Sequence, residues 1–90
     1  MAKWTIIYDG GLISKDGESY DGLDVSWLPS DVLAIQSADG VTCDIENGVQ
    51  STLWATSTQS GVATSTLSWW SNVSTTWQAA YDAANPDDGD

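Results

Sequence analysis

The sequence contains no histidine and no phenylalanine, one cysteine and two prolines among its 90 residues. Without histidine the chain cannot build a Ser-His-Asp triad, a histidine-ligated zinc site or an imidazole general base. The lone Cys43 excludes an intramolecular disulfide and a cysteine-based metal cluster. Because Cys43 alternates with Val41 and Ile45, we expect a buried thiol that packs as a small apolar side chain.

Positive charge is nearly absent. Lys3 and Lys15 stand against thirteen acidic residues, and the formal net charge is −11. Nucleic-acid sites and anionic membrane surfaces both require Lys and Arg, so we expect neither as a partner. The acidity favours solubility, a basic partner surface or divalent cations. Met1–Trp4 leads into a strand rather than a signal peptide, so we expect synthesis in a cytoplasm.

The length predicts one small domain, which we place at residues 1–86, followed by an acidic tail at 87–90. Tryptophan supplies the aromatic bulk that phenylalanine does not. Tryptophan buries a large area and is enriched at interface hot spots. We therefore expect most of the six in the core and one or two facing a partner: Trp4, Trp27, Trp54, Trp69, Trp70 and Trp77.

The N-terminal third predicts a strand followed by a hairpin. Trp4–Tyr8 is β-branched and aromatic, as strands are. Leu12–Lys15 and Glu18–Tyr20 flank Asp16-Gly17, a two-residue loop suited to a type I′ turn. Leu23–Trp27 then alternates apolar and polar residues, which predicts a half-buried strand.

The stretch Ser26–Gly48 is predicted to be the centre of the fold. It holds two apolar runs, Val32–Ser37 and Val41–Glu46, separated by Ala38-Asp39-Gly40 and ended by Asn47-Gly48. Short β-rich runs joined by Asp-Gly and Asn-Gly are a strong hairpin signal. We interpret the stretch as a central β-meander.

The register of this hairpin has two alternatives. A two-residue loop places two alanines on the face that holds Cys43, whereas a three-residue loop with a bulge at Gly40 places Leu33 and Ile35 there. The second buries more apolar area per pair, and we favour it. Either way, three residues of the second run point inward: Val41, Cys43 and Ile45.

The chain then becomes rich in serine and threonine. We expect a third strand at Val49–Ala55 to close the meander. Ser51–Ser68 suits solvated edge strands or a mobile surface loop, and a loop of this length in a compact domain is often a binding loop.

Apolar residues recur at spacings of three and four after Leu67, which predicts an amphipathic helix at about Ser68–Ala84. Asn85-Pro86 ends it, and Ser65, Thr66 and Ser68 are candidate N-caps. The helix stripe is Trp70, Val73, Trp77 and Tyr81, and its expected contacts on the sheet are Val41, Cys43, Ile45 and Ile35. The predicted fold is mainly β (α+β): a small twisted antiparallel meander or sandwich-like sheet of five to seven strands, with one C-terminal amphipathic helix.

The acidic clusters do not have the spacing of a metal site. Asp16, Glu18, Asp21 and Asp24 fall close together but lack the ligand pattern of a calcium loop, and most lie beside glycine in turns. Paired carboxylates could serve a glycosidase, but a chain of this size leaves little room for a cleft. We expect no enzyme activity, no cofactor and no metal.

Contact residues are predicted at the rim of the fold. Trp69 and Trp70 are adjacent, so on a helix they point about 100° apart and cannot share one narrow seam. Trp69 therefore either covers the sheet edge or anchors a partner. We assign partner binding to five residues: Trp69, Trp54, Trp27, Thr58 and Ser60.

Parts of the sequence resemble short bacteriophage proteins. Trp27–Gln36, the glycine turn and Cys43–Glu46 are similar to a family core of leucine-proline, an acidic residue, valine-histidine-alanine-valine-glutamine-tryptophan, a glycine turn and an isoleucine-glutamate strand. The C-terminal Trp77–Ala80 is similar as well, and Trp4–Gly11 resembles small proteins encoded near tail-fibre genes of marine and cyanobacterial phages. Leu33 and Ser37 depart from the pattern, where the family often has histidine and tryptophan.

The resemblance covers about half of the chain and carries no catalytic residue. It implies a virion protein, made in the host cytoplasm, that acts by contact with other phage structural proteins in the tail or tail fibre, as a subunit or an assembly factor. A capsid decoration protein and a carbohydrate- or calcium-binding module on a fibre are the alternatives. A DNA-mimicking inhibitor would need regularly spaced carboxylates, and here they cluster in turns. The sequence leaves homo-oligomerisation open.

Overall fold

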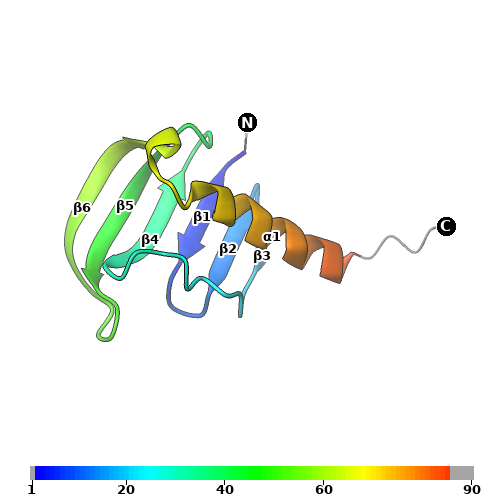
Figure 1. Ribbon diagram of the computed structural model, residues 1–90, viewed down its shortest axis with the longest axis horizontal. Coiled ribbons are helices and arrows are strands. Elements are labelled where there is room, and N and C mark those ends of the chain that lie inside the picture. The colour runs from blue at the N-terminus through cyan, green and yellow to red at the C-terminus, as the bar shows by residue number, and fades with distance from the viewer. Residues whose placement is uncertain (1, 86–90) are drawn as a thin grey trace.

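The computed structural model describes residues 2–85, which form one antiparallel sheet of six strands with an α-helix against one face (Figure 1). The mainly β fold with a C-terminal helix is confirmed, as a single sheet rather than a sandwich. The predicted acidic tail at 87–90 lies outside the described residues. The elements are β1 Trp4–Ile7, β2 Leu12–Lys15, β3 Glu18–Tyr20, β4 Val32–Ser37, β5 Thr42–Val49, β6 Trp54–Ala63, the 3₁₀ turn η1 Thr64–Thr66 and α1 Trp70–Ala84.

The first strand of the chain lies at the centre of the sheet. The strand order is β3-β2-β1-β4-β5-β6, and every neighbouring pair is antiparallel. The chain therefore runs outward from β1 to β3, crosses back through residues 21–31, and runs outward again from β4 to β6. The two outermost strands differ greatly in length, with three residues in β3 and ten in β6.

Turn chemistry accounts for the N-terminal hairpin, whose strands have the predicted bounds. Asp16 and Gly17 connect β2 to β3 with φ of 52° and 87°, as a type I′ turn requires. The Asp16 carboxylate accepts the backbone N–H of Lys3 at 2.8 Å, which ties the turn to the start of the chain.

The hairpin of β4 and β5 follows the favoured register in part. Ile35 lies opposite Ile45 and shares its face with Cys43, as predicted. Val41, in contrast, is 60% exposed. Val41 lies in the connecting turn before β5 begins, where its N–H bonds to the Asp39 carboxylate at 2.9 Å, so strand alternation does not turn it inward.

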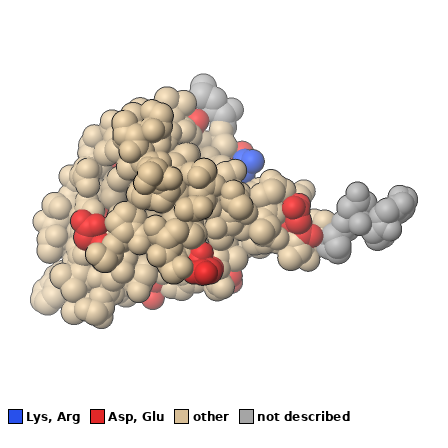
Figure 2. Space-filling view, in the orientation of Figure 1, with Lys and Arg blue, Asp and Glu red and all other residues tan. Residues whose placement is uncertain are grey.

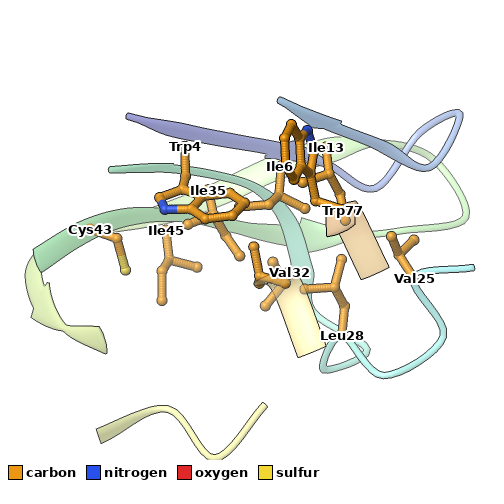
Figure 3. Packing of buried hydrophobic residues seen from close by; sticks show 11 residues of the cluster. Trp4, Ile6, Ile13, Val25, Leu28, Val32, Ile35, Cys43, Ile45 and Trp77 are labelled. Atoms are coloured by element: carbon orange, nitrogen blue, oxygen red, sulfur yellow. The ribbon is translucent and has the colours of Figure 1, made fainter. Parts of the chain in front are cut away.

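The core lies between the sheet and two covering segments, α1 and residues 21–31 (Figures 1 and 3). Burying an aliphatic or aromatic side chain of this size stabilises the fold by about 1.5–3 kcal/mol. The cluster combines residues of four strands and both covering segments. Its members are Trp4, Ile6, Ile13, Val25, Leu28, Val32, Ile35, Cys43, Ile45, Val73 and Trp77.

Trp77 packs the helix against β1 and the N-terminal hairpin. Its ring meets that of Trp4 edge to face at 6.2 Å, and its indole N–H donates to the Glu18 carbonyl at 3.0 Å. The Lys15 ammonium lies 5.0 Å from the Trp77 ring and 5.4 Å from the Trp4 ring. Cation–π contacts and aromatic pairs add to area burial, so this corner is held by more than apolar contact.

The helix begins two residues later than predicted and ends where expected. Trp69 occupies the N-cap position and makes no side-chain capping bond, so the proposed caps Ser65, Thr66 and Ser68 are wrong. Thr66 instead bonds to the carbonyl of Ala63 at 2.7 Å. Docking of Val73 and Trp77 therefore stabilises the helix more than its terminus does. No helix within residues 2–85 has the length and apolar character needed to cross a membrane.

Two predicted segments are wrong. Residues 23–27 alternate like a strand but form irregular backbone, because the Asp24 carboxylate accepts the Ser26 N–H at 3.0 Å and turns the chain. The strand expected at Val49–Ala55 spans a turn, and the serine- and threonine-rich segment after it is β6. Of the two structures this composition allowed, the edge strand is the one observed.

Candidate protein-interaction edge

β6 is the outermost strand at one end of the sheet, and one side of its backbone has no neighbouring strand within residues 2–85. Its first eight residues, Trp54–Gly61, are all exposed, and within residues 2–85 it pairs with β5 alone. Its sequence, WATSTQSGVA, contains no charged residue and no proline. Charges, proline and short length are the usual means by which proteins protect a sheet edge, and β6 has none of them. We call this strand the β6 edge.

The β6 edge is held in place by its neighbour rather than by burial. Gly61 donates its N–H to the Asp44 carboxylate at 3.0 Å, at a shift of register in the ladder. Gln59 donates to the Asn47 side chain at 2.9 Å. Thr64 closes the far end with its hydroxyl 2.8 Å from the Gly40 carbonyl. The strand is therefore fixed along its inner side while its outer side faces solvent.

An exposed apolar group lies at the start of the β6 edge, where β5 turns into it. Val49, Leu53 and Trp54 are 49%, 46% and 75% exposed, and we call them the apolar tip. Large exposed apolar side chains that lie together are typical of interaction sites.

The turn that carries the apolar tip is tightly built. A Cβ on Gly48 would lie 2.1 Å from the Trp54 carbonyl oxygen, so only glycine permits this approach of the two strands. Gln50 donates to the carbonyls of Pro29 and Val32 at 3.0 and 2.9 Å, which ties the turn to the segment before β4. Leu53 has φ of 59°, a conformation unfavourable for a leucine. Strain of this kind is concentrated at functional sites.

The sheet face opposite the core carries a shallow depression beside the β6 edge. Its volume is about 230 Å³, and it is lined by Ala34, Gln36, Asp44, Glu46 and Thr58. These residues alternate with the buried ones on β4 and β5, so they lie on the face that α1 and residues 21–31 leave uncovered. Figure 2 shows the helix-covered side, where acidic side chains are scattered among uncharged ones.

Three of the five predicted contact residues come together on the β6 edge: Trp54, Thr58 and Ser60. The other two form a separate pair. Trp27 and Trp69 stack with ring centroids 6.0 Å apart, and the Trp27 indole donates to the Thr76 hydroxyl at 3.2 Å. Both are half-buried and pack on the core, so this pair joins residues 21–31 to the start of α1.

Sequence reasoning missed Val49 and Leu53 as parts of this surface, whereas alternation along β5 already predicts that Asp44 and Glu46 face water or a partner. The sequence predicts a strand over Val49–Ala55, in which alternate side chains would be covered. The absence of charge over the ten residues of β6 was the available signal for an edge that accepts a partner.

The carboxylates with lowered pKa lie in turns, while the hydrogen bond to Glu18 raises the pKa of Tyr20 on β3. The N–H groups of Val41 and Thr42 lower the pKa of Asp39, and hydrogen bonds from Ser26 lower that of Asp24. Burial raises the pKa of the Cys43 thiol, which keeps it protonated and unreactive. Within residues 2–85, no three side chains of the metal-binding types come together to hold an ion.

The chemistry that the β6 edge offers is that of backbone amides and carbonyls, small hydroxyls and an apolar anchor. These groups suit recognition of an extended chain. No protein-family model, curated protein or solved structure matches this chain.

Proposed function

We propose that this chain is a non-enzymatic accessory or structural protein that acts by protein–protein contact, and that it receives an extended segment of its partner along the β6 edge. The observation that carries the proposal is the ten-residue outer strand, uncharged, free of proline and bonded on one side within the described chain. A partner strand placed there would continue the sheet by one strand.

The expected affinity comes from two sources. Each backbone hydrogen bond to the added strand contributes about 0.5–1.5 kcal/mol net. The apolar tip supplies side chains that a partner can cover, and Trp54 is of the residue type most enriched among interface hot spots. The rigid attachment of β6 to β5 lowers the ordering cost on this side of the contact.

The setting that we propose is the bacteriophage particle, at the tail or tail fibre, and it rests on the sequence resemblance alone. Mass spectrometry of purified particles tests it. Absence of the chain from particles, together with no complex on co-expression with the fibre protein, would contradict the setting without bearing on the β6 edge.

The strand-addition mode can be tested with peptides selected for binding from a displayed random library. Hydrogen exchange of the protein, alone and with each peptide, should show new protection at amides of Trp54–Ala63. Ser57→Lys, which places a charge on the β6 edge, should weaken binding several-fold. Ser19→Lys, the same change on the opposite edge strand β3, is the control and should leave binding unchanged.

The mode is wrong if the selected peptides protect amides on β3 or α1 and leave β6 unchanged. It is equally wrong if Ser19→Lys and Ser57→Lys weaken binding to the same extent.

A further inference from the structure

We infer that the strand received by the β6 edge is cationic, with Lys or Arg side chains at alternate positions on the uncovered face of the sheet. The inference rests on the proposed function and names the chemistry of the partner. It follows from how the side chains of β4, β5 and β6 are ordered in rows across that face.

One row runs straight from the sheet interior to the edge. Ala34 lies opposite Glu46, and Glu46 lies opposite Thr58. The neighbouring row contains Gln36 opposite Asp44. The carboxylates of both rows are thus on β5, one strand inside the edge, with a depression around them, and Glu46 has the short side chains of Ala34 and Thr58 on either side.

A long cationic side chain can reach these carboxylates from an added strand. Neighbouring strands lie about 4.8 Å apart, so a residue added beside Thr58 stands about 10 Å from the backbone of Glu46. Thr58 is small, and a Lys or Arg side chain can lie across it into the depression. Aliphatic stems of these residues pack on such surfaces while the charged end reaches a carboxylate.

No cation of the chain itself belongs to the strands around the depression. Its two basic residues are Lys3 and Lys15, both before β3 in sequence, and the Lys15 ammonium lies over Trp4 and Trp77 on the covered face. A partner residue bearing a negative charge would meet Glu46 and Asp44 as like charges, which destabilises cross-strand neighbours. Charge complementarity therefore favours a basic strand.

A second copy of the chain fits this surface less well. Pairing of β6 with β6 would place two uncharged strands together and bring no cation to Asp44 or Glu46. It would also join two molecules that each carry a net charge of −11. Self-association through this edge at neutral pH is thus an outcome that would contradict the inference.

Three synthetic peptides test the inference: one in which lysine alternates with valine, and two in which glutamine or glutamate replaces each lysine. Dissociation constants are measured by titration at about 0.01 M and about 0.15 M ionic strength, with hydrogen exchange to locate each peptide. The lysine peptide should bind β6 more tightly than the glutamine peptide, and the advantage should shrink at the higher ionic strength. The glutamate peptide should bind most weakly.

Asp44→Asn and Glu46→Gln should each weaken binding of the lysine peptide by about two- to five-fold, as loss of an exposed ion pair does. Both should leave the glutamine peptide unaffected. Asp82→Asn on α1 removes an acid elsewhere and is the matched control. All three variants keep the size of the side chain, and Asp44→Asn keeps an oxygen that can accept the Gly61 N–H, so each should remain folded at the assay temperature in thermal unfolding.

The outcomes separate the two proposals. If the glutamine peptide protects β6 and binds as tightly as the lysine peptide, the cationic partner is wrong and the strand-addition mode stands. If no peptide protects β6, the mode itself fails. If sedimentation shows dimers at neutral pH that Ser57→Lys dissociates, the partner is a second copy and the inference is overturned.

Discussion

At the scale of single residues, Leu53 has an unfavourable backbone and an exposed side chain at once. Its φ is 59° and its side chain is nearly half exposed, so packing does not compensate for the conformation. The left-handed region costs an L-residue about 1–2 kcal/mol, whereas glycine adopts it readily.

We expect Leu53→Gly to stabilise the protein by about 1 kcal/mol in urea unfolding followed by tryptophan fluorescence. Leu53→Ala keeps the Cβ and the strain and should give no such gain. A loss of stability in Leu53→Gly would show that the leucine side chain contributes more to the fold than its exposure indicates.

The tryptophans show which core positions local sequence patterns can predict and which they cannot. Trp77 follows from helical periodicity, and Trp4 from the first strand. The stack of Trp27 on Trp69 joins residues 42 positions apart, and no local pattern specifies such a pair. It depends on residues 21–31 crossing the same sheet face as α1.

At the scale of elements, the turn between β4 and β5 is organised by one carboxylate. Asp39 accepts the N–H groups of Val41 and Thr42 at 2.9 and 3.1 Å, and these bonds lower its pKa. A lowered pKa in the folded state means that ionised Asp39 stabilises the fold above the usual Asp pKa, about 3.9. That stabilisation is lost as pH falls through the lowered value.

We therefore expect Asp39→Asn to destabilise the protein at neutral pH. Asparagine can accept the same two hydrogen bonds, but it lacks the negative charge that strengthens them. The difference in urea midpoint between the original protein and the variant should shrink as pH falls below about 4. The measurement is made at micromolar protein concentration, so that association between molecules near pH 4 does not contribute to the urea midpoint. A difference that stays constant with pH would mean that the charge of Asp39 does not support the turn.

Prediction from sequence succeeded for elements bounded by turn residues. β2, β3 and β4 have the predicted bounds because Asp-Gly, Pro and Asp residues stand at their ends. β6 was harder to predict, since an edge strand exposed on both faces needs no apolar alternation. Residues 23–27 show the converse, because an alternating pattern arises there without a strand partner.

At the scale of the whole molecule, the net charge opposes association between molecules, whereas the β6 edge favours it. The β6 edge is open to pairing, while a net charge of −11 keeps molecules apart at neutral pH. The isoelectric point of the sequence is about 4.1, where this repulsion vanishes. The balance between monomer and assembly should therefore depend on pH.

We expect a monomer at neutral pH and reversible β-rich association near pH 4, seen by light scattering and infrared spectroscopy. Ser57→Lys on the β6 edge should suppress the association, and Ser19→Lys on β3 should have a smaller effect. Equal suppression by the two variants would show that net charge alone governs association.

The hydrogen bond from the Trp77 indole to the Glu18 carbonyl also has a consequence for the order in which the protein folds during synthesis. The two residues are 59 positions apart, and the helix that carries Trp77 is the last element of the described chain. During synthesis α1 leaves the ribosome after all six strands, because it follows them in the sequence. Until α1 has emerged, Trp4 and its core neighbours lack their contacts with Val73 and Trp77, so the strands cannot complete the core by themselves.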